Sequence, residues 1–273
     1  MSETPVPAPT PSSTLLLLRD ADLGLEVFML ERHRQIDFAP GAMVFPGGKL
    51  DPEDAVPTLH AHCRGVEELA PEAVALRVGA LREAFEECGV LLARPRGGDA
   101  LVSAERAFAI EARHRKPLHA GESGLLEIVE AEEFELACDL LVPFAHWITP
   151  EASPRRYDTH FFLVAGPPEP VATHDGQESV DSVWITPDRA LEEEAAGRRT
   201  IVFPTLMQLR KLGRSNDVAA ALAAARSDTI VSVLPWVEPG DTGPQLCIPE
   251  DAGYEPARVP LAEAFKTSPG TRQ

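Results

Sequence analysis

The 273-residue sequence predicts an α/β (α+β) protein, because strand-like and helix-like segments are interspersed along one chain. Apolar, β-compatible runs cover residues 14–19 and 25–32, and the turn between them predicts a hairpin. A third such run covers residues 157–165. The stretch 75–93 has helical spacing and carries three glutamates on one face. This helix is the most informative segment of the chain.

The other predicted elements are shorter. Strands are expected at residues 42–45, 142–147 and 180–185, and helices at 58–70, 103–116, 124–137, 187–196, 203–212 and 215–226. Pro71 gives a start signal for the glutamate-bearing helix, since proline is tolerated at the first helical position. Gly89 suits a left-handed cap at its end, which assigns this glycine a structural role.

Composition divides the chain into three parts. Residues 1–13 contain alternating prolines among small polar residues and are expected to be a flexible tail. Residues 14–230 hold the predicted elements and form one domain, with insertions at about 55–72 and 95–140. Residues 231–273 contain seven prolines and little periodicity, which indicates an extension that wraps the surface or is partly disordered.

The net charge of −18 argues against a nucleic-acid partner, because phosphate backbones are bound by basic patches. The charge also keeps the chain soluble, and it allows a phosphorylated small molecule as substrate if metal ions supply positive charge. The four cysteines lack CxxC spacing and are interpreted as reduced thiols of a cytoplasmic protein. Apolar runs are too short for a membrane span or a signal peptide, so no membrane partner is expected.

The carboxylates of Glu83, Glu86 and Glu87 stand at i, i+3 and i+4 and share one helix face. A run of glutamates on a helix is usually a solvated face. The alternative is a site for hard divalent cations, which prefer oxygen ligands. The residues upstream favour the second interpretation.

Two upstream features fit a phosphate-binding or metal-binding site. Arg32 ends a predicted strand, where it could meet a substrate phosphate or remain solvated. Gly47 and Gly48 follow the strand at 42–45, where they permit either a plain turn or a close approach of the backbone to another group.

Together these residues resemble the Nudix box. Its second half matches at Arg82-Glu83-x-x-Glu86-Glu87-x-Gly89, with apolar residues in the apolar positions. Its first half departs from the pattern, since Asp54 stands where the family has Glu after Gly48 and five residues. The spacer before Arg82 has 27 residues instead of seven, so 27 − 7 = 20 residues are inserted.

The resemblance extends to one Nudix branch, that of the peroxisomal coenzyme A diphosphatases. The similar segments are 38–48, 143–151, 154–162 and 174–178, followed by Trp184. The peroxisomal location is not carried over, because the sequence ends in Thr-Arg-Gln. The branch implies the Nudix fold, a mixed β-sheet sandwiched between helices, with helical insertions. It also implies hydrolysis of a diphosphate linkage in coenzyme A or acyl-coenzyme A.

The resemblance implies Mg²⁺ or Mn²⁺ as cofactor. Glu86 and Glu87 would bind the metal, Glu83 would be a further ligand or the catalytic base, and Gly48 would offer its carbonyl or permit the turn. Arg82 would pair with an acidic neighbour and hold the helix.

Further site residues follow from the same branch. A late-loop glutamate, Glu178, is an alternative base to the box glutamates Glu83 and Glu86, or a surface acid. Arg155 and Arg156 would contact a 3′-phosphate, or flank the strand as solvated cations.

Alternatives stay open on substrate and activity. The substrate could instead be a nucleotide sugar, a dinucleoside polyphosphate or an oxidised nucleotide. The domain could also be a catalytically silent nucleotide-binding module, which the departures at Asp54 and in the spacer leave possible. The insertion at 95–140 is expected to pack over the substrate cleft or to form a homodimer contact.

Overall fold

The computed structural model describes residues 6–33, 41–167, 179–241 and 243–265. Within these ranges the central sheet has nine strands, seven of them in the order β10-β3-β2-β1-β8-β7-β11. Strands β1 (Thr10–Ala21) and β2 (Gly24–Arg32) are antiparallel, which confirms the predicted hairpin. Strand β8 (Tyr157–Ala165) runs parallel to β1 and antiparallel to β7 (Val142–Ile148), so the sheet is mixed.

The remaining strands of this sheet are short or lie at its edges. They are β3 (Ala42–Val44), β4 (Gly47–Lys49), β9 (Ser179–Ile185), β10 (Thr200–Ile201) and β11 (Ser232–Val233). Strands β1 and β2 separate beyond Leu18 and Val27, and the β3–β4 segment fills the fork: β3 pairs with β2 and β4 with β1. Gly47 is needed in the fork, because a Cβ there would lie 2.4 Å from the Ser13 carbonyl oxygen.

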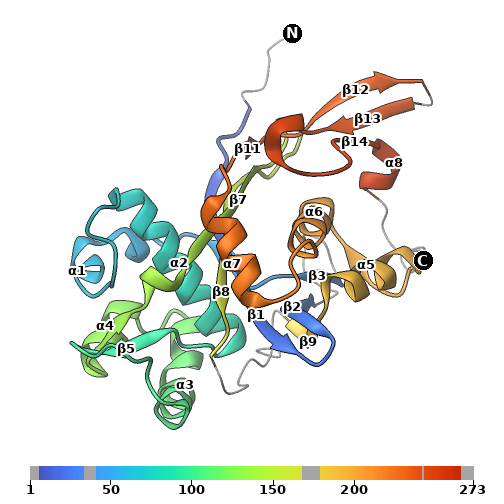
Figure 1. Cartoon of the computed structure of the whole chain (residues 1–273). Helices are drawn as coiled ribbons and strands as arrows, with labels where there is room; N and C mark the ends of the chain where they lie inside the picture. The colour runs from blue at the N-terminus through green and yellow to red at the C-terminus, as the bar shows by residue number, and fades with distance from the viewer. Residues whose placement is uncertain (1–5, 34–40, 168–178, 242, 266–273) are drawn as a thin grey trace.

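Helices cover both faces of the sheet, as the resemblance implies (Figure 1). Helix α2 (Pro71–Cys88) packs on one face, and α6 (Phe203–Leu212) and α7 (Val218–Ser227) pack on the other. Alternating residues of β1 explain the two layers: Leu15 and Leu17 enter the α2 core, and Leu16 and Leu18 enter the opposite core. The fold is therefore the predicted mixed sheet between helices.

Helix α2 begins and ends at the predicted signals. Pro71 occupies its first turn, and Gly89 caps its C-terminus in the left-handed conformation at φ 71°. The Gly89 N–H donates to the Phe85 carbonyl and the Val90 N–H to the Ala84 carbonyl, which satisfies the end of the helix. The apolar side of α2 is buried in the core, so the opposite side is left to its charged residues.

The first insertion is less helical than expected. Within 58–70 the structure has only part of the four-residue α1 (Pro57–His60), which follows the 3₁₀ turn η1 (Pro52–Ala55). The chain then turns at Gly65, with φ 69°, where a Cβ would lie 2.6 Å from Cβ of Asp139. The chain therefore packs closely against Asp139 at this turn, where a helix was predicted.

The second insertion contains α3 (Ala104–His119) and α4 (Leu125–Ala131), close to the predicted helices. The predicted helix at 124–137 is too long, because the buried residue Phe134 begins β6 (Phe134–Leu136). This strand pairs with β5 (Ala93–Pro95), so tertiary pairing overrides the helical pattern.

Two helices on the other side of the sheet match their predicted ranges closely. Helix α5 (Pro187–Ala195) starts at its proline, and α6 covers Phe203–Leu212 as expected. Helix α7 (predicted at 215–226) starts later than expected, because Asp217 caps it by accepting from the Ala220 N–H at 2.7 Å.

Described residues in both terminal segments form elements that composition did not predict. Strand β1 starts at Thr10, inside the segment 1–13 expected to be a tail, because β8 offers a parallel partner there. The C-terminal segment forms a second sheet of β12 (Trp236–Gly240), β13 (Gly243–Cys247) and β14 (Arg258–Pro260), followed by α8 (Leu261–Ala264), at the upper right of Figure 1. Among the described residues, no helix is both long and apolar enough to cross a membrane.

Candidate active site

Arg82 of α2 lies at the centre of a buried charged cluster. Its Nε and Nη2 donate to the two carboxylate oxygens of Asp54 at 2.9 and 3.0 Å, and Nη2 also donates to the Lys49 carbonyl at 2.9 Å. Its Nη1 donates to Oε1 of Glu83 and of Glu86, each at 3.0 Å. The expected pairing of Arg82 with an acidic neighbour is thus observed, and it joins α2 to the segment that follows the glycine turn.

Asp54 reaches Arg82 although 27 residues separate them in sequence. The turn η1 holds Asp54, because its carboxylate accepts from the Asp51 N–H at 2.8 Å. The Asp54 side chain is fully buried, and it bridges the turn and the helix. The residues inserted between Asp54 and Pro71 do not prevent this contact. The two halves of the Nudix-box pattern, which the insertion separates in sequence, are therefore in contact in the structure.

Two of the three carboxylates of α2, those of Glu83 and Glu87, approach the glycine turn. Oε2 of Glu87 accepts from the Gly47 N–H at 2.8 Å. A Cβ at Gly48 would lie 2.4 Å from Oε1 of Glu83, so only glycine allows this carboxylate to approach the backbone so closely. The Glu83 and Glu86 side chains are 14% exposed, which leaves them accessible to a small ion. Hard oxygen donors beside a glycine backbone fit a divalent cation.

Burial raises the pKa of Glu83 to about 7, with the charges of Glu86 and Asp54 adding to the effect and Arg82 opposing it. Burial lowers the pKa of Arg82, but its hydrogen bond with Asp54 and the charges of Glu83 and Glu86 outweigh this, so its pKa is raised. Arg82 therefore stays charged and balances part of the negative charge around it.

Helix α3 of the second insertion lies against the carboxylate end of α2. Nε of Arg115 donates to the Glu86 carbonyl at 2.9 Å, and Nδ1 of His119 lies 3.8 Å from Oε2 of Glu86. A Cβ at Gly89 would lie 2.4 Å from Oε1 of Glu111, so the two helices are tightly packed there. The insertion thus supplies part of the surroundings of Glu86, and sequence analysis did not assign His119 or Arg115 to the site.

The predicted substrate-binding arginines differ in their surroundings. Arg156 is buried, and it donates to the carbonyls of Thr149 at 3.0 Å and Pro7 at 2.9 Å. These bonds link the start of β8 to the end of β7 and to the segment that precedes β1, which is a structural role that the sequence did not indicate. Arg32 is half-buried, and its Nε has no partner among the described residues. Arg155 is exposed, and Glu178 lies outside the described residues.

A second polar cluster was not predicted as a site. His146, Asp158 and His160 form it, and their potential ligand atoms all lie within 4.8 Å of one another. Among the described residues, the three glutamates of α2 do not converge to this degree. The available signal was the alternation in Asp158-x-His160 together with His146 on the preceding strand. Both segments were noted only for their family resemblance.

A mixed sheet between helices, with an Arg-Glu-x-x-Glu-Glu helix facing a glycine turn, is the architecture of the Nudix class. The chain belongs to this family, because the model of the NUDT19 Nudix domain matches residues 52–212. The match includes the whole of α2 and both insertions.

Individual relatives agree with this assignment. The chain is 25% identical over 228 residues to the Xenopus laevis acyl-coenzyme A diphosphatase NUDT19, covering 68% of this chain and 59% of the relative. It is 27% identical over 227 residues to the Homo sapiens protein of the same name, covering 69% and 60%. It is 28% identical over 193 residues to the putative nudix hydrolase 7 of Caenorhabditis elegans, covering 70% and 57%. The chain thus spans less than two thirds of the length of these curated relatives.

A solved structure supports the fold independently. A NUDIX hydrolase from Alicyclobacillus acidocaldarius superposes with a TM-score of 0.64 at 28% sequence identity, covering 79% of this chain and 96% of that one. The similarity therefore extends over nearly the whole of the bacterial protein.

Proposed function

We propose that the chain is a Mg²⁺- or Mn²⁺-dependent hydrolase that cleaves the diphosphate linkage of coenzyme A or acyl-coenzyme A. The observation that carries the proposal is the approach of Glu83 and Glu87 to the glycine turn, with Glu86 beside them on Arg82, which also pairs with Asp54. The names of the two vertebrate relatives support this substrate class.

The glutamates fit the proposed metal because they offer only oxygen atoms, and Glu83 and Glu86 are partly accessible whereas Glu87 is buried. A bound Mg²⁺ or Mn²⁺ would neutralise negative charge on the diphosphate and activate the attacking water. Glu86 and Glu87 would hold the metal, and Gly48 would keep the backbone close to it. Glu83 is a candidate base as well as a ligand.

Arginine side chains outside the carboxylate cluster would bind the substrate. Arg32 supports this role, since its half-buried guanidinium has an unpartnered Nε within the described part of the chain. Arg155 is a candidate for the 3′-phosphate of coenzyme A. Arg156 stays a weaker candidate, because two backbone carbonyls already engage its guanidinium. Glu178 is proposed as the alternative base.

The test is product analysis with purified protein, Mg²⁺ and coenzyme A, beside a panel of nucleotide sugars, dinucleoside polyphosphates and oxidised nucleotides. We expect 4′-phosphopantetheine and adenosine 3′,5′-bisphosphate as products. Glu86→Gln and Glu87→Gln should each reduce kcat on the order of 10²-fold, because each removes a carboxylate that would hold the metal ion which stabilises the transition state. Glu72→Gln, an exposed substitution on the same helix, is the matched control.

Each outcome of this test has a distinct meaning. If the protein hydrolyses another panel member faster than coenzyme A, that compound would replace coenzyme A as the proposed substrate. No turnover of any member would favour a silent binding module. Equal activity in Glu86→Gln, Glu87→Gln and Glu72→Gln would exclude the proposed metal ligands.

A further inference from the structure

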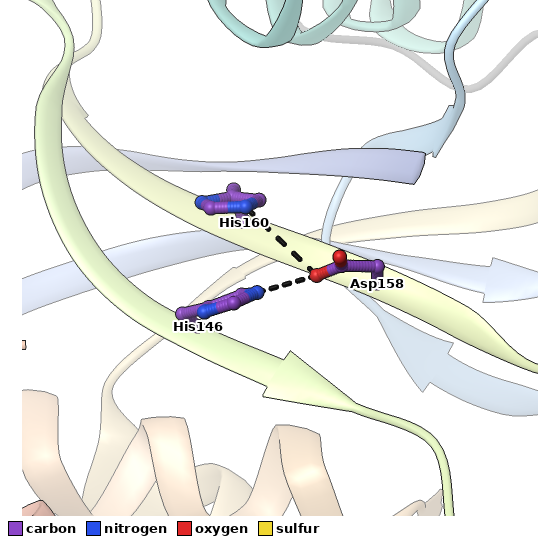
Figure 2. Close-up of side chains that lie close together, drawn as sticks. All are labelled: His146, Asp158 and His160. Atoms are coloured by element: carbon purple, nitrogen blue, oxygen red, sulfur yellow. Dashed lines mark hydrogen bonds and ion pairs between the residues drawn. The ribbon is translucent and has the colours of Figure 1, made fainter. Parts of the chain in front are cut away.

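The cluster of His146, Asp158 and His160 differs in chemistry from the carboxylates of α2, because it offers two imidazole rings beside one carboxylate. His146 and His160 lie directly opposite each other on the antiparallel strands β7 and β8, and Asp158 precedes His160 by two residues on the same face. Figure 2 shows the two rings lying one above the other with the Asp158 carboxylate beside them. The ring centroids are 4.1 Å apart. Paired strands hold all three side chains, which is a more rigid support than a loop.

The donor atoms of the three side chains converge. Nε2 of His146 is hydrogen-bonded to Oδ1 of Asp158, and Nε2 of His160 lies 3.9 Å from the same oxygen. All three ligand atoms lie within 4.8 Å of one another. Zn²⁺ binds imidazole nitrogen and carboxylate oxygen at about 2.0–2.2 Å, so small side-chain rotations would bring all three atoms to one ion.

The other ring nitrogen of His146 also has a partner. Nδ1 lies 2.6 Å from Oγ of Ser232, on the strand β11 that pairs with β7 at this residue. A histidine that binds a metal characteristically donates its second ring N–H to an oxygen. If Nδ1–H donates to Ser232, Nε2 presents a lone pair to the Asp158 carboxylate. Two such electron-rich atoms need a proton or a cation between them.

The surroundings allow an ion to enter. The side chains of His146, Asp158 and His160 are 17%, 33% and 35% exposed. Arg77 is the cation that opposes an incoming ion, and its guanidinium lies 5.2 Å from the centre of the Phe162 ring.

We propose that His146, Asp158 and His160 form a second metal site, which takes a transition-metal dication of the Zn²⁺ type. Imidazole donors select Zn²⁺ and its neighbours, whereas Mg²⁺ prefers oxygen donors and retains its waters. The site supplies three protein ligands and leaves a fourth position for water or another small ligand. It does not depend on the proposed hydrolase activity.

The test uses full-length protein without a polyhistidine tag, stripped of metals by a chelator. Co²⁺ is the spectroscopic probe, because its visible absorption reports nitrogen and oxygen ligation, and Zn²⁺ binding is measured by calorimetry. The background is Glu83→Gln/Glu86→Gln/Glu87→Gln, which removes the carboxylate site. We expect one equivalent of Co²⁺ with visible absorption bands, displaced by one equivalent of Zn²⁺ and not by Mg²⁺.

Ligand variants and a matched control complete the experiment. His146→Gln, His160→Gln and Asp158→Asn should each weaken Zn²⁺ binding by about 100-fold or more, since even outer-sphere changes cost 10–100-fold. His62→Gln is the control, because its side chain is 20% exposed and lies outside the cluster. Circular dichroism of the metal-free variants establishes that they fold. Since His160 makes fewer polar contacts than His146, His160→Gln keeps the test valid if His146→Gln fails to fold.

Two results would overturn the proposal. One is the absence of Co²⁺ bands in the triple-Gln background. The other is Zn²⁺ affinity in His160→Gln and Asp158→Asn equal to that of His62→Gln, which would leave an imidazolium–carboxylate pair as the explanation of the cluster.

Discussion

At the scale of single residues, Gly48 and Arg82 determine the shape of the candidate active site. Gly48 leaves space for the Glu83 carboxylate, and Arg82 holds two of the α2 carboxylates and Asp54. Both roles depend on contacts between segments that the long spacer separates in sequence. Each therefore yields a prediction that one substitution can test.

Gly48→Ala should impair metal binding more than folding. The new Cβ would lie 2.4 Å from Oε1 of Glu83 and force this carboxylate to move. Misplacing a functional group by about 1 Å can cost on the order of 10²-fold in rate, and we expect a loss of that size together with weaker Mn²⁺ binding by calorimetry. Gly213→Ala is the control, because its Cβ would meet no atom closer than 3.3 Å. Unchanged Mn²⁺ affinity in Gly48→Ala would contradict the prediction.

Arg82→Met should destabilise the protein by about 3–5 kcal/mol, because it leaves the fully buried Asp54 carboxylate unpaired. Arg82→Lys should recover only part of this loss, since lysine cannot replace the two bonds to Asp54. The free energy of unfolding in urea measures both effects. The double variant Asp54→Asn/Arg82→Met should be more stable than Arg82→Met alone. Additive losses would show that the pair is not coupled.

At the scale of elements, the two helices of the second insertion are joined to each other by polar contacts around Glu132. This residue follows α4, and its carboxylate accepts from Nε2 of His114 at 2.8 Å and from Arg113, both on α3. Its backbone carbonyl accepts from Arg106. Hydrogen bonding to His114 lowers the pKa of the Glu132 carboxyl, with the charges of Arg113 and His114 contributing and burial opposing. The α3–α4 pair is therefore stabilised by an ionised glutamate.

Glu132→Gln should cost about 1 kcal/mol at pH 7, after allowance for the exposure of Arg113. The carboxyl has a folded-state pKa below its unfolded value of 4.5, so its contribution is present above that pH and is lost as the pH falls through the folded pKa. The stability difference between wild type and variant should shrink below about pH 4.5. Urea unfolding at several pH values measures it, and Glu127→Gln on the exposed side of α4 is the control. A difference independent of pH would argue against the ionised pair.

At the scale of the whole molecule, the C-terminal segment is joined to the core of the domain. Leu246, Ile248, Tyr254 and Val259 belong to the same buried cluster as α6 and α7. The Tyr254 hydroxyl accepts from Nε1 of Trp147 at 3.1 Å and donates to Oε1 of Gln208 at 2.9 Å. The second sheet therefore contributes to the stability of the domain.

Tyr254→Phe should destabilise the protein by about 1–3 kcal/mol, because it leaves the buried Trp147 and Gln208 groups without this partner. Truncation after Val233 should cost more, since it also exposes the apolar residues beneath the second sheet. Thermal unfolding measures both variants. A truncated chain as stable as the full chain would show that the C-terminal segment is dispensable.

The sequence by itself determined the mixed fold, the main strands and the helix that carries the glutamates. Periodicity, Pro71 and Gly89 are local signals. They predict α2 and the β1–β2 hairpin correctly because the caps of the helix and the pairing of the hairpin involve residues that are close in sequence. Local signals also placed three carboxylates on one helix face. Local signals failed where pairing with a distant strand determines the secondary structure. This happens at Phe134, which pairs with β5, and at the start of β1, which pairs with β8.

Only the tertiary structure decided which distant residues meet. Asp54 reaches Arg82 across an insertion, His119 lies beside Glu86 from another, and strand pairing gathers His146, Asp158 and His160. Spacing along the sequence carries no information on such contacts, because burial and strand register determine them. The helix was therefore predictable from its own residues, whereas the surroundings of its carboxylates and the histidine cluster were not.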